Sequence, residues 1–220
     1  MQNAFMNMFS QAQQEKIAAA VREAEKVTSG EIVPYVVGRS DHYEVAEWRG
    51  GFLGGFVVFV AMTFLRSAAG GWIRFDPLAI AAATLLAGGG AMLAVRFFPP
   101  LMRLFAGSHL MTRRVEQRAA EAFVSEEVFA TEKRTGILIF LSMLERRVLV
   151  IGDTGIHGKV RQDEWHEIIS IVVKAIRAGE PADGLAEAIR RCGALLAGHG
   201  AGRTAGDRDE LSDNLRIRKE

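Results

Sequence analysis

Two long stretches in the middle of the chain contain no charged residue. They run from Gly50 to Leu65 and from Pro77 to Val95, with a short polar segment between them. At 1.5 Å per residue, helices over these stretches would be roughly 24 Å and roughly 28 Å long, against about 30 Å for the hydrocarbon core of a bilayer. The pattern predicts a transmembrane helical hairpin over residues 48–96.

The residues around the two stretches support this prediction. Trp48 precedes the first stretch and Trp72 lies in the connecting segment, where aromatic rings favour the membrane interface. A hairpin buried in a soluble core is the alternative, but the rest of the chain is too small to enclose two apolar helices. The arginines near the spans are Arg66 and Arg74 in the loop, against Arg39, Arg49, Arg96, Arg103, Arg113 and Arg114 outside it. By the positive-inside rule, we expect two spans in the inner (cytoplasmic) membrane, with both outer segments in the cytoplasm.

Two further features agree with a cytoplasmic location. The first residues, Met1 to Phe9, have neither the basic region nor the cleavage site of a signal peptide. Cys192 is the single cysteine, so an intrachain disulfide is excluded.

Outside the hairpin, the spacing of apolar residues predicts helices alternating with strands. The expected helices run from a capping box at Ser10 and Gln13 to about Val27, over roughly Thr112–Lys133, from an Asp163 cap to about Ile176, and from an Asp183 cap to Gly198. The expected strands, rich in β-branched residues, are Glu31–Val37, Gly136–Ser142 and Arg147–Gly152. Residues 97–109 are typical of an interfacial re-entry segment, and residues 199–220 of a disordered tail.

The connections between the strands predict how they pair. Four residues join the second strand to the third, which favours an antiparallel hairpin. The first and second strands are separated by a long insertion, which permits parallel pairing with a right-handed crossover. Pro34 has no backbone N–H and indicates an edge position or a bulge in the first strand. Gly30 and Gly136 each follow a helix, where a left-handed helix cap is expected.

The order of several motifs resembles the TPM domain family. These motifs are Glu25–Ile32 (EKVTSGEI), Thr135–Phe140 (TGILIF), Arg147–Asp153 (RVLVIGD) and the turn into a helix at Gly179–Leu185. The resemblance covers about residues 10–38 and 110–198, so the hairpin would interrupt one split domain. It implies an α/β fold in which a small central sheet is flanked by helices and interrupted by the transmembrane hairpin.

The resemblance also implies an acidic site near the ends of strands. The matching residues are Glu31, Asp153 and Asp163, and for some family members the implied ligand is calcium, which takes six to eight oxygen ligands. Each residue also has a purely structural interpretation. Glu31 can end a strand, Asp153 precedes a Thr-Gly turn, and Asp163 can cap a helix.

Other chemical motifs are less specific. His157 and His166 lie near two of these carboxylates, but their spacing matches no standard zinc site. Cys192 lies on the apolar stripe of the last helix, which favours a packed thiol over a nucleophile, and Asp153 is the candidate for aspartyl phosphoryl transfer. A net charge of +1 without a basic stripe argues against nucleic-acid binding.

Glycines in the apolar stretches predict close helix packing. Gly50 with Gly54, and Gly51 with Gly55, form small-xxx-small pairs, and Gly88–Gly90 could supply the facing surface. The sequence leaves open whether this contact forms within the hairpin or between two chains.

These observations lead to two hypotheses about function. The first is a membrane-anchored interaction domain that assists membrane-protein assembly, maintenance or quality control, with the lipid bilayer and another membrane protein as partners. The alternative is a metal (calcium)-dependent acid phosphatase, which the resemblance implies for some members. A subunit of a transporter or channel is disfavoured, because the spans carry no internal charge.

Overall fold

The computed structural model describes residues 9–68, 76–157, 160–199, 202–203 and 210–218. The chain divides into two compact units, one comprising Met1–Ser40 with Arg114–Glu220 and the other Asp41–Arg113. Trp72 and Arg74 of the predicted loop lie outside the described residues.

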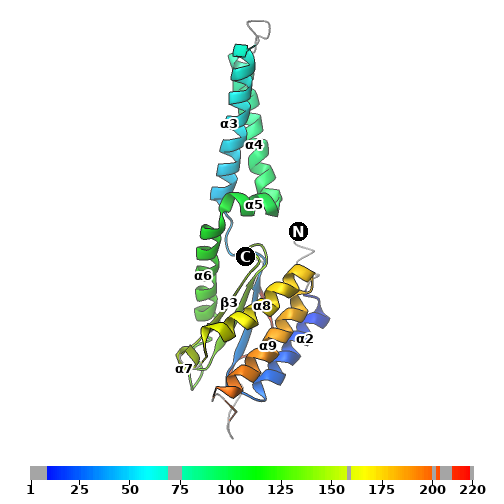
Figure 1. Cartoon of the computed structure of the whole chain (residues 1–220), viewed down its shortest axis with the longest axis vertical. Helices are drawn as coiled ribbons and strands as arrows, with labels where there is room; N and C mark the ends of the chain where they lie inside the picture. The colour runs from blue at the N-terminus through cyan, green and yellow to red at the C-terminus, as the bar shows by residue number, and fades with distance from the viewer. Residues whose placement is uncertain (1–8, 69–75, 158–159, 200–201, 204–209, 219–220) are drawn as a thin grey trace. The chain divides into compact units, whose positions relative to one another are not determined.

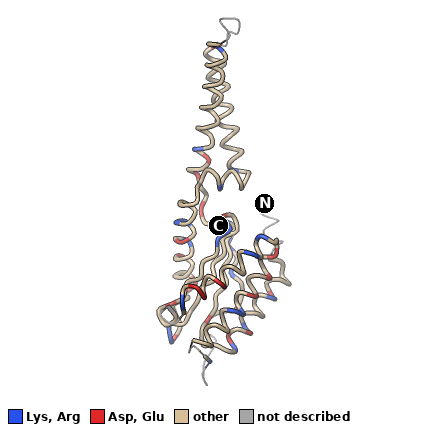
Figure 2. The backbone as a smooth tube through the Cα atoms, viewed as in Figure 1, with Lys and Arg blue, Asp and Glu red and all other residues tan. Residues whose placement is uncertain are grey.

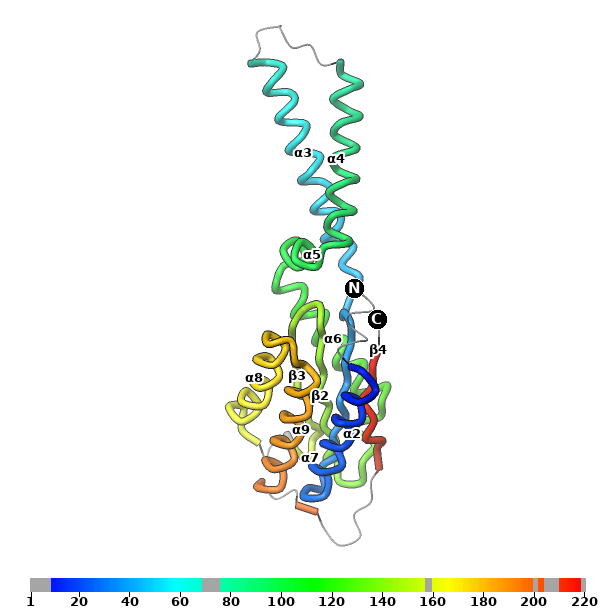
Figure 3. Tube along the Cα trace, turned by 90° about the vertical axis from the view of Figure 1, so that its right-hand side faces the viewer, coloured from blue at the N-terminus to red at the C-terminus, as the bar shows by residue number. Residues whose placement is uncertain are grey.

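The first unit contains a four-stranded mixed sheet in the order β3-β2-β1-β4 (Figures 1 and 3). Its strands are β1 (Ile32–Val37), β2 (Ile137–Ser142), β3 (Arg147–Gly152) and β4 (Arg216–Arg218). β1 runs parallel to β2 and to β4, whereas β2 and β3 are antiparallel. The parallel pairing of β1 with β2 and the antiparallel hairpin of β2 with β3 are therefore confirmed.

Helices cover both faces of this sheet. On one face lie α2 (Gln11–Glu25), α8 (Gln162–Ala178) and α9 (Pro181–Gly198), whose apolar sides pack against Ile32 and Ile137 (Figure 1). On the other face, Val115 and Ala119 of α6 (Ser108–Ser125) share a core with Leu138. All residues of β1 and β2 are buried, which explains why these strands are continuous apolar runs in the sequence. The predicted α/β fold with helices flanking a small sheet is confirmed.

The helix ends differ in places from those expected. α2 begins as predicted, because the Ser10 N–H donates to Gln13 Oε1 at 2.9 Å. α6 ends at Ser125 instead of near Lys133, and Glu127 after it has a positive φ of 52°. α7 (Thr154–His157) is a short additional helix after β3.

Asp163 and Asp183 do not cap helices, contrary to expectation. Arg161 is the N-cap of α8, and its N–H donates to Glu164 Oε2 at 2.9 Å. Glu180 is the N-cap of α9. Both aspartates lie in the first turn of their helix, where a negative charge still interacts favourably with the helix dipole.

Pro34 lies in an interior strand, so the predicted edge position is wrong. The Gly38 N–H donates to Arg218 O at 3.1 Å, and residues of the same parity, including Pro34, direct their backbone nitrogen to the β4 side. Within the described residues, β4 pairs only with Tyr35–Val37. The missing N–H of Pro34 therefore costs the sheet no ladder hydrogen bond.

Gly30 and Gly136 are not left-handed helix caps. Among the described glycines, positive φ values occur at Gly107 and Gly179 only. A Cβ atom on Gly136 would stand 1.8 Å from Val128 O, and one on Gly30 would stand 2.8 Å from Leu196 Cδ1. Gly136 requires glycine because the Val128 backbone lies against it, whereas at Gly30 the nearest atom is the end of a leucine side chain.

The C-terminal segment adds a strand that the sequence did not predict. Residues 199–220 were expected to be disordered, but Arg216–Arg218 form β4. Glu126 forms ion pairs with both arginines of this strand, with Arg216 Nε 3.4 Å from Oε2 and Arg218 Nη2 3.3 Å from Oε1. Ion pairs and one strand pairing thus hold a segment that has little apolar content.

The second unit contains two long helices and a short one, together with the start of α6. α3 (Glu44–Ala68) and α4 (Pro77–Phe97) pack side by side, and α5 (Pro99–Ala106) runs across the end where α3 begins and α4 ends (Figures 1 and 3). We call this end the hairpin foot. The helices have 25 and 21 residues, which corresponds to about 38 Å and about 32 Å. α3 is longer than its uncharged stretch because it begins at Glu44.

Candidate functional site

The predicted close packing of glycines occurs inside the hairpin. A Cβ atom on Gly51 would stand 3.2 Å from Gly88 O, and one on Gly54 would stand 2.5 Å from Ala91 Cβ. Gly89 and Gly90 have no atom within 4 Å of the corresponding position. Of the three consecutive glycines in α4, Gly88 therefore forms the surface that faces α3.

The outer surface of the two long helices is apolar and exposed. Phe52, Leu85 and Leu86 are each exposed by 76% or 77%. Beyond the hairpin foot, charged residues are sparse along both helices (Figure 2). Only 6% of the most apolar stretch of α3 and 11% of that of α4 is buried, whereas a core helix of a soluble protein is mostly buried. Both helices are long and apolar enough to cross a membrane.

Polar contacts tie the three helices together at the hairpin foot. Glu47 of α3 is 6% exposed, and its Oε2 lies 3.4 Å from Arg96 Nη1 of α4. The Arg49 Nη1 donates to Phe105 O of α5 at 3.0 Å. A Cβ atom on Gly50 would stand 2.4 Å from Val95 Cγ2, so α3 and α4 also approach closely here.

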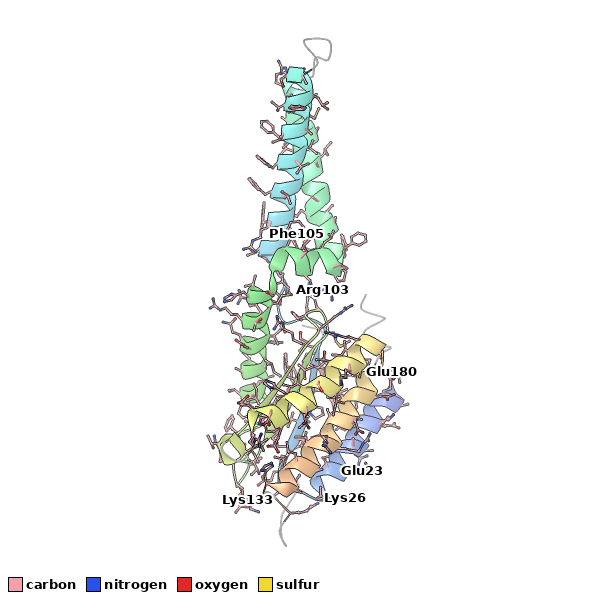
Figure 4. All side chains as sticks on the ribbon, viewed as in Figure 1. Glu23, Lys26, Arg103, Phe105, Lys133 and Glu180 are labelled. Carbon is pink, nitrogen blue, oxygen red and sulfur yellow. The ribbon has the colours of Figure 1, made fainter. Side chains whose placement is uncertain are left out.

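The short helix α5, which lies at the hairpin foot, is amphipathic. Met102 and Ala106 are buried, whereas Leu104 is 71% exposed. Figure 4 shows Arg103 and Phe105 on opposite sides of α5, with Phe105 on the side of the long helices. A short helix with an exposed leucine and an arginine on another side is typical of the membrane interface.

Glu31 and Asp153 lie at one end of the sheet in the first unit. The Ile137 N–H donates to Glu31 O at 2.8 Å, and the Asp153 N–H donates to Gly136 O at 2.9 Å. The backbones of the two acidic residues are therefore separated by β2 and lie two strand spacings, about 10 Å, apart. Both side chains are buried, with exposed fractions of 6% and 4%.

The Asp153 carboxylate is held by Arg134 and by the start of α7. Arg134 Nη2 donates to Asp153 Oδ1 at 3.0 Å, and Arg134 Nε lies 2.7 Å from Oδ2. The Thr154 N–H also donates to Oδ1, at 2.7 Å. Within the described residues, Oδ1 therefore accepts two hydrogen bonds, whereas the buried Oδ2 lies at ion-pair distance from the guanidinium without accepting a hydrogen bond.

Arg134 was not among the residues predicted from the sequence. The signal lies in the register of the β2–β3 hairpin, in which Ile137 is opposite Gly152. This register places Asp153 opposite Gly136, two residues from Arg134. A basic residue just before one strand and an acidic residue just after its antiparallel partner can therefore be recognised as a pair.

The Glu31 carboxylate contacts the C-terminal segment. The Leu211 N–H donates to Glu31 Oε2 at 3.3 Å. Nearby, the Thr135 hydroxyl donates to Ser29 O at 2.8 Å, which joins the segments before β1 and β2. The contact with Leu211 gives Glu31 a structural role in joining the C-terminal segment to the sheet.

Asp163 lies apart from this end of the sheet, on the exposed first turn of α8. It forms an ion pair with Arg161, and hydrogen bonding by that guanidinium lowers the pKa of the Asp163 carboxyl below its usual value. His166 on the same helix is exposed, as expected for a residue off the apolar stripe. The side chain of His157 is outside what the structure describes.

The three predicted acidic residues do not gather into one cluster. Within the described residues, no three His, Cys, Asp or Glu side chains form a group that could hold a metal ion. The structure brings Glu31 and Asp153 to the same end of the sheet and pairs each of them with another group. Calcium binding by these residues stays a prediction.

A second buried polar cluster lies at the opposite end of the sheet. The Ser40 N–H donates to Glu145 Oε1 at 2.9 Å, and the Ser40 and Ser142 hydroxyl oxygens are 2.8 Å apart. The Ser142 hydroxyl also donates to Glu145 Oε2. Because Ser40 is the last residue of the first unit before α3, this cluster attaches the exit of the chain to the β2–β3 turn.

Comparisons with known proteins identify the family that this α/β unit resembles. Residues 106–195 match the model of the TPM domain family, which confirms the resemblance inferred from the sequence. The match begins after the two long helices and does not include residues 10–38.

A solved structure shares the fold. The chain is similar to the BA42 protein of the psychrophilic bacterium Bizionia argentinensis, determined by NMR, with a TM-score of 0.57 and 18% sequence identity. The similarity covers 95% of this chain and 94% of that chain. At this level of identity, the similarity concerns the fold alone. The comparison with curated proteins found no match.

Proposed function

We propose that the chain is a membrane-anchored interaction domain that assists the assembly, maintenance or quality control of another membrane protein. One observation carries the proposal: a hairpin with an exposed apolar surface is inserted into an α/β unit, between β1 and α6. An anchor at one end of the chain would leave the domain free on a tether. An insertion leaves the domain with two covalent connections to the anchor.

The details of the hairpin foot support membrane anchoring. Trp48, Phe97 and Phe98 are each exposed by 60% or more, and aromatic side chains are favoured at the membrane interface. Arg49 and Arg103 lie at the same end of the hairpin, where basic side chains can reach anionic headgroups. In this proposal α5 is the interfacial segment, and the α/β unit is cytoplasmic.

The chemistry of the α/β unit favours binding over catalysis. Asp153 is tied to Arg134, Asp163 is an exposed surface residue, and Cys192 is fully buried. Burial raises the pKa of the Cys192 thiol to about 12, so it is a poor nucleophile at neutral pH. These residues therefore offer an enzyme no activated nucleophile.

Membrane anchoring is tested by placing a charge on the exposed apolar surface. We expect the intact chain to stay in the membrane pellet after alkaline carbonate extraction. Phe56→Arg combined with Leu86→Arg should release a large fraction, because an arginine at the bilayer centre costs about 3 kcal/mol. Val124→Arg, at an exposed apolar residue of α6, is the matched control. Release of the unaltered chain by carbonate would contradict the anchor.

The partner is tested by cross-linking in native membranes. The intact protein should capture a specific membrane protein, and reciprocal capture from that protein should recover this chain. The carbonate-released variant should lose the partner, whereas Val124→Arg should retain it. Cross-linked membranes in which the intact chain captures no membrane protein would contradict the interaction role.

The calcium-dependent phosphatase alternative rests on the TPM resemblance and on the buried Asp153 at a strand end. Hydrolysis of a generic phosphate ester that is lost in Asp153→Asn and on chelation would favour it. Hydrolysis that neither change affects would exclude Asp153 as the catalytic group.

A further inference from the structure

We propose that the guanidinium of Arg134 takes the place of a bound cation at Asp153, so that this end of the sheet is held together without metal. Removing Arg134 would then open the buried Asp153 carboxylate and create a site for a divalent cation there. The proposal concerns the α/β unit and is independent of any membrane partner.

The geometry of the pair supports this role. Two guanidinium nitrogens of Arg134 approach the two oxygens of Asp153, at 3.0 Å and 2.7 Å. The guanidinium carbon also lies 5.7 Å from the centre of the Phe129 ring, in a cation–π contact. A carboxylate that is 4% exposed requires a positive partner, because a buried charge without one is strongly destabilising.

The backbone fixes the position of Arg134. Its φ of 55° is in the left-handed region, which non-glycine residues rarely adopt. The Arg134 N–H donates to Thr131 O at 3.1 Å, and Arg134 O accepts from the Gly155 N–H at 2.9 Å. A Cβ atom on Gly155 would stand 2.6 Å from Arg134 O, so α7 and the loop before β2 fit tightly together. The backbone from which the Arg134 side chain extends is therefore fixed.

The exposure of the two side chains explains why a cation could replace Arg134. The Asp153 side chain is 4% exposed, whereas that of Arg134, which contacts it, is 51% exposed. Truncating Arg134 opens the carboxylate to water. Calcium binds carboxylate oxygens and completes its shell with carbonyl oxygens and water, so it can supply the lost positive charge.

The ion pair of Arg161 and Asp163 provides a matched control. It has the same chemistry, but its side chains are 75% and 61% exposed. Exposed ion pairs contribute little to stability, since water already solvates both charges. Loss of the Arg161 side chain should therefore neither lower the unfolding temperature nor make the protein bind calcium.

The test measures thermal unfolding of the full chain in detergent micelles, with chelator or with calcium chloride, and calcium binding by calorimetry. We expect the unaltered chain to unfold at the same temperature in both conditions. Arg134→Ala should unfold roughly 5 °C lower with chelator, regain part of the loss with calcium and bind calcium in the calorimeter. Arg161→Ala should behave like the unaltered chain. Arg134→Ala combined with Asp153→Asn should unfold above Arg134→Ala and lose the calcium response.

Three results would overturn the proposal. The first is stabilisation of the unaltered chain by calcium that disappears in Asp153→Asn, since the native site would then use metal. The second is an Arg134→Ala chain that unfolds at the unaltered temperature. The third is an Arg134→Ala chain that is destabilised but shows no response to calcium. If Arg134→Ala does not fold with chelator, recovery of folding by calcium or by the added Asp153→Asn supports the proposal, and failure of both overturns it.

Discussion

The carbonyl oxygen of Val128 lies 1.8 Å from the position that a Cβ atom on Gly136 would take. The Val128 N–H donates to Phe123 O at 3.1 Å, which ties the loop after α6 back to the end of that helix. The loop therefore rests on the sheet where β2 begins, and Gly136 lies between the strands that carry Glu31 and Asp153. Neither the carbonyl nor the strand can move without disturbing several hydrogen bonds.

We therefore expect Gly136→Ala to lower the free energy of unfolding by about 3 kcal/mol, because the new methyl group overlaps backbone atoms. Gly198→Ala is the control, since no atom lies within 4 Å of its Cβ position at the end of α9. That change should leave stability equal or raise it by about 0.5 kcal/mol. Urea unfolding followed by circular dichroism measures both. Equal effects of the two changes would contradict the close contact.

In the hairpin, Gly51→Ile should weaken the packing of α3 on α4 by about 2 kcal/mol, because the side chain would meet the Gly88 carbonyl at 3.2 Å. Gly89→Ile introduces the same side chain on the same hairpin where no atom lies within 4 Å. Thermal unfolding in micelles should show a lower transition for the first variant only. A reversed order would mean that the glycines face another partner.

The Cys192 thiol should react slowly in the folded protein. Burial raises its pKa to about 12, so about one thiol in ten thousand is ionised at pH 8. Alkylation of the folded chain should be far slower than that of the chain in denaturant. Because the pKa of the thiol is higher in the folded chain than in the unfolded chain, only the unfolded chain ionises just above about pH 9. This group therefore makes the free energy of unfolding fall as pH rises above about 9. Rapid alkylation of the folded chain would show that α9 opens.

Glu145→Ala should destabilise the end of the sheet from which the chain leaves for α3. The Ser40 N–H would lose its acceptor and the Ser142 hydroxyl would lose one of its two partners, at a cost of about 2 kcal/mol. Hydrogen exchange at the Ser40 amide should become faster. Glu145→Gln retains a carbonyl acceptor and should preserve much of the protection. Unchanged exchange in Glu145→Ala would show that this contact does not hold the exit of the chain.

Several elements were predictable because they depend on local chemistry. The apolar runs of β1 and β2, the stripe of α8 and the capping of α2 by Ser10 follow from spacing and side-chain type. The β2–β3 hairpin follows from its short connection. Errors occurred where a neighbour distant in sequence decided the outcome. Pro34 is tolerated in an interior strand because β4 stops short of it, and Gly136 is a glycine because of Val128.

In the candidate acidic site, too, some features follow from the sequence and others depend on residues that are distant in the sequence. Sequence resemblance selected Glu31 and Asp153, and the strand register brings both to one end of the sheet. The sequence resemblance did not reveal that Arg134 forms an ion pair with Asp153 or that Asp163 lies on an exposed helix turn. Ion pairing depends on where two side chains meet in space, and spacing along the chain contains that information only when the register is known.

The sequence by itself determined the two apolar helices, the order of the main elements and the antiparallel pairing of the second and third strands, and it permitted the parallel pairing of the first and second. These properties arise from the distribution of apolar residues and from the lengths of connections, both of which are local. Only the tertiary structure decided that the glycines of α3 pack on α4, that the C-terminal segment adds β4, and that a guanidinium neutralises the buried Asp153. Each of these depends on contacts between residues distant in the sequence, whose energies exist only once the fold has brought them together.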